Sequence, residues 1–172
     1  MTAMTLLPAS NTEVPASDYV ITGLKTMMGR EGTAYSAKVR KGKHVIADLL
    51  QDGNGGELRY DFVTRDDEAE FNEFVKLWEG MVWGITDFSP EGFPFDDAES
   101  VLDFFVMDQI LLKELKRASK TKLLLLKAGE SPRDLYNIVT KLTFDHPDLK
   151  AILAKDLPQV ALYWNGEGWV AP

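Results

Sequence analysis

The sequence predicts an α+β fold, with an antiparallel β-meander packed against two main helices and a C-terminal β-β-α-β segment. Three observations predict it. Residues 19–64 contain extended stretches rich in β-branched, aromatic and apolar residues, separated by glycine-containing turns. Residues 64–119 place apolar side chains at helical spacing. The last third alternates short strand-like and helix-like patterns.

Four strands are expected in the first stretch, and their connections are so short that neighbouring strands must be antiparallel. The turn at 52–56 contains an Asp-Gly and an Asn-Gly pair, the strongest hairpin signal in the chain. After this turn, Leu58, Tyr60 and Phe62 alternate with polar residues, as in a strand with one buried face. The expected strands are 19–27, 33–40, 44–51 and 57–63.

The first main helix follows directly. Phe71, Phe74 and Trp78 recur at helical spacing, so one face of this helix is apolar. Thr64 is a suitable N-cap, because its hydroxyl can accept a hydrogen bond from the first turn. Gly80 is a suitable stop signal.

The second main helix is expected over 97–119, where a broad apolar stripe predicts a central helix lying across the sheet. Acidic residues at its start and basic residues at its end suit the helix dipole. Between the two helices lies the aromatic-rich loop 83–95. Its rings are expected to pin the loop to the core rather than to recognise a ligand.

The last third is expected to form the β-β-α-β segment. Four consecutive leucines within 122–127 predict a short strand that is covered on both faces. A second strand is expected over 135–142, and a short helix capped by Asp145 is expected to end at Pro158. A final strand over 160–164 leads into a turn at 165–168.

Length and composition favour one α+β domain over 19–172, since 172 residues with 45% hydrophobic content can build a sizeable core. Residues 1–18 contain no Lys or Arg and several Pro, Ser and Thr residues, so a flexible N-terminal arm is expected there. No apolar run approaches the roughly 20 residues that span a bilayer. A cytoplasmic protein without membrane contact is the expectation, and the absence of cysteine excludes disulfides and thiolate metal sites.

Segment 19–63 carries the pattern of a known group. It contains Glu31, an aromatic residue among small ones at 34–37, Gly42-Lys43 and the glycine-rich turn at 52–56, and a Lys-Thr-Lys-Leu stretch follows the basic helix end at 120–123. In these features the chain resembles a group of uncharacterised small phage and bacterial proteins with a Gly-rich N-terminal β-meander. It departs from the pattern in its 1–18 arm and its leucine run. The resemblance implies a phage or mobile-element accessory protein and carries no activity or catalytic residue.

A calcium site is the first chemical hypothesis, because Asp52, Asn54 and Glu57 are oxygen donors within a glycine-rich turn. A helix-loop-helix calcium site requires glutamate at its twelfth position, which here is Val63. The hairpin interpretation accounts for the same residues, so neither a metal nor a cofactor is expected.

Catalytic hypotheses are weak. The two histidines, His44 and His146, are far apart in the sequence, and a lone general base is the most that either offers. The Glu-Leu-Lys triplet at 114–116 lies on a predicted helix, where side chains two apart do not share a face. The turn at 29–32 lacks the strand-to-helix context of a phosphate-binding loop. No catalytic residue is predicted.

Charge distribution is the strongest functional signal. Residues 64–108 hold thirteen acidic and two basic side chains, a net charge of −11, within a chain of net charge −8. Solvated helix faces with acidic N-termini explain this pattern without any function. A docking surface for a basic partner, one that mimics nucleic acid, is the functional explanation. The residues assigned to this acidic face are Asp66, Asp67, Glu70, Glu73, Asp96, Asp97 and Glu99.

The favoured function is therefore a non-enzymatic phage or mobile-element accessory protein that binds a host or defence protein. The expected partner is a host-encoded protein with a basic surface, and direct nucleic-acid binding is not expected. One alternative is a small enzyme or ligand-binding domain, with a site near the Gly32 and Asp52 turns and the 83–95 loop. Another alternative is a structural subunit of an assembly, which would expose an apolar patch or an open sheet edge.

Overall fold

The computed structural model describes residues 3–83, 92–132 and 136–172. Within these ranges the chain contains three α-helices and antiparallel strand pairs, which confirms the predicted α+β class. No helix in the described part of the chain is long and apolar enough to cross a bilayer.

The chain divides into two compact units, and each is described by itself. Unit 1 comprises Met1–Met4 and Pro15–Met107. Unit 2 comprises Thr5–Val14 and Asp108–Pro172. The boundary falls inside the long helix α2 (Ala98–Ala118), so each unit contains about half of that helix. The single domain expected over 19–172 stays a prediction.

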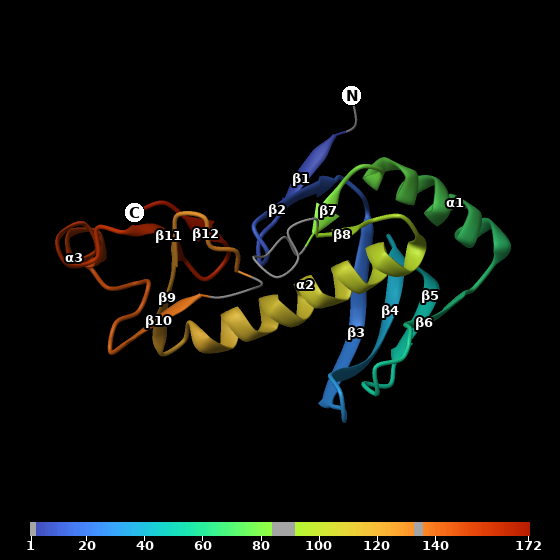
Figure 1. The fold of residues 1–172 in the computed structure, drawn as a ribbon, viewed down its shortest axis with the longest axis horizontal. Helices are drawn as coiled ribbons and strands as arrows, with labels where there is room; N and C mark the ends of the chain where they lie inside the picture. The colour runs from blue at the N-terminus through green and yellow to red at the C-terminus, as the bar shows by residue number, and fades with distance from the viewer. Residues whose placement is uncertain (1–2, 84–91, 133–135) are drawn as a thin grey trace. The chain divides into compact units, whose positions relative to one another are not determined.

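The sheet of unit 1 is the predicted meander (Figure 1). Its strands lie in chain order and all neighbours are antiparallel. The last strand is shorter at both ends than its pattern predicts. One reason is that the backbone N–H of Leu58 donates to Glu99 of α2, at 2.8 Å, instead of joining the sheet. The strands are β3 (Tyr19–Met28), β4 (Thr33–Lys41), β5 (His44–Gln51) and β6 (Arg59–Phe62).

Helix α1 (Arg65–Val75) packs on one face of this sheet and continues into a 3-10 turn, η1 (Lys76–Trp78). Thr64 is its N-cap as predicted, since its Oγ1 accepts from the Asp67 N–H at 3.1 Å. The ring of Phe71 lies 5.6 Å from that of Phe62 on β6. Buried aromatic contacts of this kind hold α1 against the sheet.

The first half of α2 covers the same face. The hydroxyl of Tyr35 on β4 donates to Asp103 of α2 at 2.7 Å. Antiparallel pairing places Tyr35 on the face that also carries Tyr60 and Phe62, because Ala37 opposes Leu49 and Leu49 opposes Tyr60. The two main helices therefore share one face of the sheet, in agreement with the predicted packing.

The loop between these helices begins and ends as a short antiparallel pair, β7 (Val82–Trp83) and β8 (Phe93–Pro94). Phe95 is buried, with its ring 4.7 Å from that of Trp78. The prediction that aromatic residues pin this loop is thus confirmed for Phe95, whereas Phe93 is 53% exposed. Residues 84–91 lie outside the described residues.

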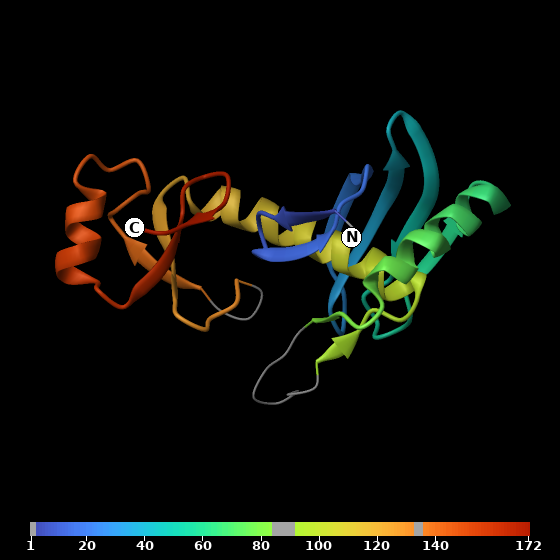
Figure 2. The ribbon, with the colours of Figure 1, turned by 90° about the horizontal axis from the view of Figure 1, so that it is seen from above.

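The sheet of unit 2 is built around β9 (Lys122–Lys127), which is buried on both faces as predicted. Leu124 and Leu126 face a cluster that contains Trp164. Leu123 and Leu125 face a second cluster that includes α3 (Leu149–Asp156), the orange helix of Figure 2. This helix begins four residues after the expected cap, Asp145. The strand order is β10 (Asn137–Thr140), β9, β11 (Val160–Trp164) and β12 (Trp169–Val170).

Residues 4–15 differ from the predicted flexible arm of 1–18, because they form a hairpin of β1 (Met4–Leu7) and β2 (Thr12–Pro15). Ala9 and Ser10 at its tip are buried in unit 2. The indole Nε1–H of Trp169 donates to the Ala9 carbonyl at 2.9 Å. The Ser10 N–H donates to Asp108 at 3.0 Å. These partners are distant in the sequence, so no local sequence pattern predicts the hairpin.

Candidate functional site

Two hollows lie along β6 and the loop before it, both in unit 1. The first, which we call the β6 cavity, has a volume of about 360 Å³ and is lined by consecutive residues from Tyr60 to Arg65 and by Glu68. The second, the α2 cavity, has a volume of about 460 Å³. It is lined by Gln51, Gly56, Leu58, Phe93, Pro94, Asp96, Asp97, Glu99, Ser100 and Asp103.

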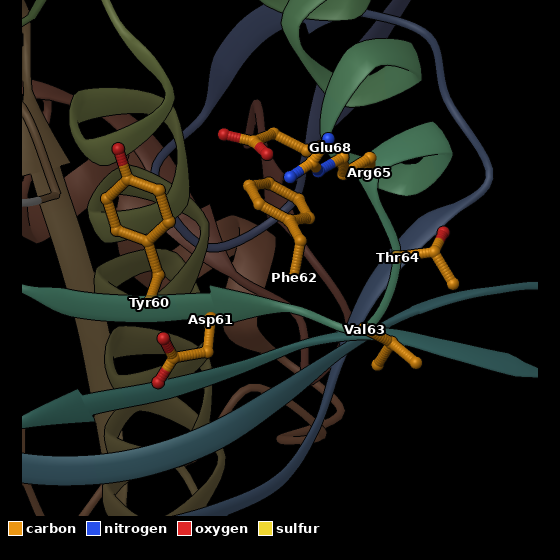
Figure 3. Close-up of a pocket in the computed structure, with 7 residues that line it drawn as sticks. All are labelled: Tyr60, Asp61, Phe62, Val63, Thr64, Arg65 and Glu68. Atoms are coloured by element: carbon orange, nitrogen blue, oxygen red, sulfur yellow. The ribbon is translucent and has the colours of Figure 1, made fainter.

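The alternation of β6 positions the residues of the β6 cavity (Figure 3). Tyr60 and Phe62 point to one side of the strand, and Asp61 and Val63 point to the other. The rings of Tyr60 and Phe62 meet edge to face, with centroids 5.9 Å apart. The side that carries these rings is the helix-covered side, and Asp61 and Val63 contribute to the lining from the other side.

The hydroxyl of Tyr60 is influenced by carboxylates from both main helices. Burial raises the pKa of its hydroxyl above the ordinary value, and the carboxylates of Asp97, Glu99 and Glu68 raise this pKa further. Two of these carboxylates belong to the start of α2, and the third belongs to α1. Carboxylates from the linings of both cavities therefore act on this one hydroxyl.

The start of α2 holds its carboxylates in fixed positions. Asp97 accepts from the Ser100 N–H at 2.7 Å and so caps the helix. Glu99 accepts from the Leu58 N–H at 2.8 Å, and Asp103 accepts from the Tyr35 hydroxyl. Each of these bonds occupies one carboxylate oxygen, which leaves the other able to accept from a ligand. These carboxylates are therefore ordered and still able to bind.

The acidic residues predicted on α1 are in a different situation. Glu70 forms an ion pair with Lys41, and Glu73 forms one with Lys76 at 2.6 Å. Asp67 accepts from the Thr64 hydroxyl at 2.6 Å. Asp66 is exposed in the first turn. Because two of the four carboxylates are already paired with lysine, α1 offers less unbalanced negative charge than the start of α2.

The ion pair of Lys41 and Glu70 lies beside the ring of Tyr19. The hydrogen bond to Glu70 raises the pKa of this lysine, and its Nζ lies 5.8 Å from the ring centroid of Tyr19. Burial raises the pKa of Tyr19, and Glu70 raises it further. Glu70 thus interacts with the β3–β4 side of the sheet, whereas Glu68 lines the β6 cavity.

Of the predicted acidic residues, the structure brings Asp96, Asp97 and Glu99 together in the α2 cavity. The cavities also include Glu68 and Asp103, which the prediction counted as acidic but did not select. The position of Asp103 could have been predicted from the sequence. It follows Glu99 by four residues and so lies on the same helix face. Asp61 of β6 lines the β6 cavity as well. We call the two cavities, with their six carboxylates, the acidic groove: Asp61, Glu68, Asp96, Asp97, Glu99 and Asp103.

The other sequence candidates have local structural roles. Asp52 accepts from the Asn54 N–H at 2.9 Å, which is a turn within the β5–β6 connection. His44 is exposed at the β4–β5 turn and lines neither cavity. His146 accepts from the Asp148 N–H through Nδ1 at 3.2 Å. Among the described residues, no group of three or more His, Asp or Glu is placed to hold a metal ion.

Comparisons with known protein families, with curated proteins and with solved structures find no match. The resemblance to small phage and bacterial proteins therefore stays a prediction. The role of the acidic face as a binding surface also stays a prediction. The carboxylates that line the acidic groove support it.

Proposed function

We propose that this protein is a non-enzymatic binding protein that docks a basic surface of another protein onto the acidic groove. The observation that carries this proposal is the imbalance of charge in the described cavity linings. Six carboxylates line the two cavities, and Arg65 is the one cationic side chain in these linings. Lys and Arg side chains of a partner would form charge-assisted hydrogen bonds there.

The charge of the wider segment supports the same proposal. The net charge of −11 over residues 64–108 attracts a basic partner over several ångströms and raises the association rate. Exposed Asp66 on α1 extends the negative surface beyond the groove. A protein whose natural ligand is nucleic acid presents a basic surface of this kind. We therefore propose a host or defence protein as the partner, and a phage or mobile element as the source of the chain.

The proposal is tested by affinity capture from bacterial lysate followed by mass spectrometry. The test variant combines Glu68→Gln with Asp96→Asn, because neither side chain caps a helix. The matched control combines Glu13→Gln with Glu167→Gln, two exposed acidic residues outside the groove. A partner that uses the groove should bind the test variant at least about tenfold more weakly and bind the control normally, since the loss of even one charged hydrogen bond costs about 1.5–3 kcal/mol.

A partner that binds both variants equally would contradict the proposal. Reversing charges on α1 is a less direct test, because Glu70 and Glu73 are paired with lysines and Asp67 bonds to the Thr64 cap. Asp66→Lys alone isolates the contribution of α1. It should weaken binding by a smaller factor than the groove variant.

A ligand-binding domain is the second candidate, and the position of the α2 cavity favours it. Its lining includes Gly56 of the Asp52 turn and Phe93 of the 83–95 loop, two of the features that this alternative names, but not Gly32. Its carboxylates would select a small organic cation. Titration with putrescine should then shift the amide resonances of residues 96–103. An absence of shifts at millimolar putrescine would leave only the protein-binding proposal.

A further inference from the structure

Strand β6 forms one edge of the unit 1 sheet. In the described part of the chain it pairs with β5 and with no other strand. An edge strand has a row of backbone N–H and C=O groups that can pair with an added strand. Arg59 and Asp61 are exposed on the face of the sheet that the helices leave uncovered.

The pairing of β6 determines which backbone groups face outward. The Val63 N–H donates to the Ile46 carbonyl at 2.8 Å, so the backbone of Val63 points toward β5. Hydrogen-bonded and non-hydrogen-bonded pairs alternate along antiparallel strands. Arg59 and Asp61 therefore also point toward β5, and the N–H and C=O groups of Tyr60 and Phe62 point toward the open edge.

The opposite edge of the sheet is less suited to strand addition. Strand β3 is interrupted by a register shift between Thr22 and Lys25. Gly23 lies within this bulge, with a positive φ of 62°. Bulges of this kind twist an edge strand and protect it from pairing. No such interruption occurs in the pairing of β6 with β5.

Both cavities of the acidic groove are lined in part by β6 or by the residues just before it. The β6 cavity is lined by the strand itself, and the α2 cavity is lined by Leu58 immediately before it. Side chains of a strand alternate between two faces, so every second residue of an added strand would point to the helix-covered side. There it would meet carboxylates of Glu68, Asp97 and Glu99, the same groups that raise the pKa of Tyr60.

We propose that the partner inserts an extended Lys/Arg-containing segment as a fifth strand beside β6, bonded to the backbones of Tyr60 and Phe62. Every second side chain of this segment is basic and enters the acidic groove. Backbone pairing supplies affinity and the two cavities supply specificity, as in other cases of strand addition. This inference rests on the proposed function and names the kind of segment that the partner presents.

Synthetic peptides test the inference on the full chain. The probe is an octapeptide of alternating Lys and Thr, made in one unmodified form and two N-methylated forms. Each N-methylated form blocks one set of alternate amides and keeps the charge. An added strand bonds to β6 through only one set of amides. One N-methylated form should therefore bind about tenfold or more weakly, and the other should bind like the unmodified peptide.

Hydrogen exchange locates the added strand. The amides of Tyr60 and Phe62 should exchange on the order of tenfold or more slowly when the unmodified peptide is bound. The variant Tyr60→Pro removes one outward N–H, which an edge strand tolerates. Peptide binding should be lost in Tyr60→Pro and kept in the Glu13→Gln/Glu167→Gln control, whose substitutions lie outside the groove. If Tyr60→Pro does not fold, the N-methylated peptides give the same answer on the unaltered protein.

The failure of this inference can be distinguished from the failure of the proposed function. If all three peptides bind equally and Glu68→Gln/Asp96→Asn weakens all of them, the groove binds charge without strand addition and the inference is wrong. If no peptide binds at millimolar concentration, the inference is also wrong, while lysate capture still decides the proposed function. Protection of Tyr60 and Phe62 that grows with protein concentration, without peptide, would identify a second copy as the occupant and overturn it.

Discussion

The two four-stranded sheets of this protein use their surfaces differently. In unit 2 the central strand β9 is buried on both faces by leucines that face two separate apolar clusters. In unit 1 helices cover one face, while the other face carries the exposed pair Lys38–Asp48 and the half-exposed Leu50. In unit 2, both faces of the central strand are therefore used for packing. The sheet of unit 1 keeps an open face, an open edge and an acidic groove, and recognition is therefore expected there.

The largest expected effect tests the packing of β9. Leu124→Ala removes a fully buried side chain and should lower the free energy of unfolding by about 2–5 kcal/mol. The control is Leu50→Ala on the open face of unit 1. This substitution should change the free energy of unfolding by less than about 1 kcal/mol. Urea denaturation followed by tryptophan fluorescence measures both. Equal losses of unfolding free energy in the two variants would contradict the proposed difference between the two sheets.

The next effect concerns the helix-covered face of unit 1. Tyr35→Phe removes the hydrogen bond from a buried hydroxyl to Asp103 and should cost about 1.5–3 kcal/mol at neutral pH. Burial raises the pKa of Tyr35 well above its ordinary value of 10.0, and the charge of Asp103 raises it further.

The same residue predicts a dependence on pH. Because the pKa of Tyr35 is higher in the folded than in the unfolded state, its contribution is complete below pH 10. Above pH 10 the unfolded tyrosine loses its proton, so the folded protein should lose about 1.4 kcal/mol per pH unit through this residue. The loss should be absent in Tyr35→Phe. Identical pH profiles for the two proteins between pH 10 and 11.5 would refute this cause.

A smaller effect is expected at the N-terminal hairpin. Trp169→Phe keeps an aromatic ring in unit 2 but removes the hydrogen bond to the Ala9 carbonyl. The expected loss is about 1 kcal/mol in the free energy of unfolding. Met4→Ala, at an exposed position of β1, is the control and should be nearly neutral. A neutral Trp169→Phe would mean that this bond does not hold the hairpin.

The hairpin also shows where sequence patterns stop being informative. The meander and both main helices were predictable, because turn glycines, N-caps and apolar spacing are local signals. Ala9 and Ser10 are buried by Trp169 and Asp108, whose positions in the sequence are 160 and 98 residues away. A short polar segment with prolines gives no local sign of such partners. The flexible-arm prediction failed for that reason.

The smallest effect concerns the open face of unit 1. Lys38 and Asp48 form an exposed ion pair across β4 and β5, with more than half of each side chain accessible. A double-mutant cycle with Lys38→Ala and Asp48→Ala should give a coupling energy below about 1 kcal/mol. A coupling energy above about 2 kcal/mol would mean that the open face of unit 1 contributes substantially to stability. That result would contradict the contrast with the fully packed sheet of unit 2.

The acidic groove was predictable in part. Local charge counting identified Asp96, Asp97 and Glu99, which the structure gathers in one cavity. It could not identify the role of Tyr60, because the carboxylates near its hydroxyl come from two helices. It also could not show that Glu70 and Glu73 are paired with lysines, since one of those lysines, Lys41, lies on a distant strand. Tertiary contacts decide which acidic residues remain available.

The most direct test of the central claim is a titration of the full chain with the alternating Lys/Thr octapeptide, followed by amide chemical shifts. We expect the shifted resonances to belong to residues 58–68 and 96–103, and we expect Glu68→Gln/Asp96→Asn to reduce these shifts. Shifts confined to unit 2, or spread evenly over the acidic residues of the whole chain, would contradict the central claim.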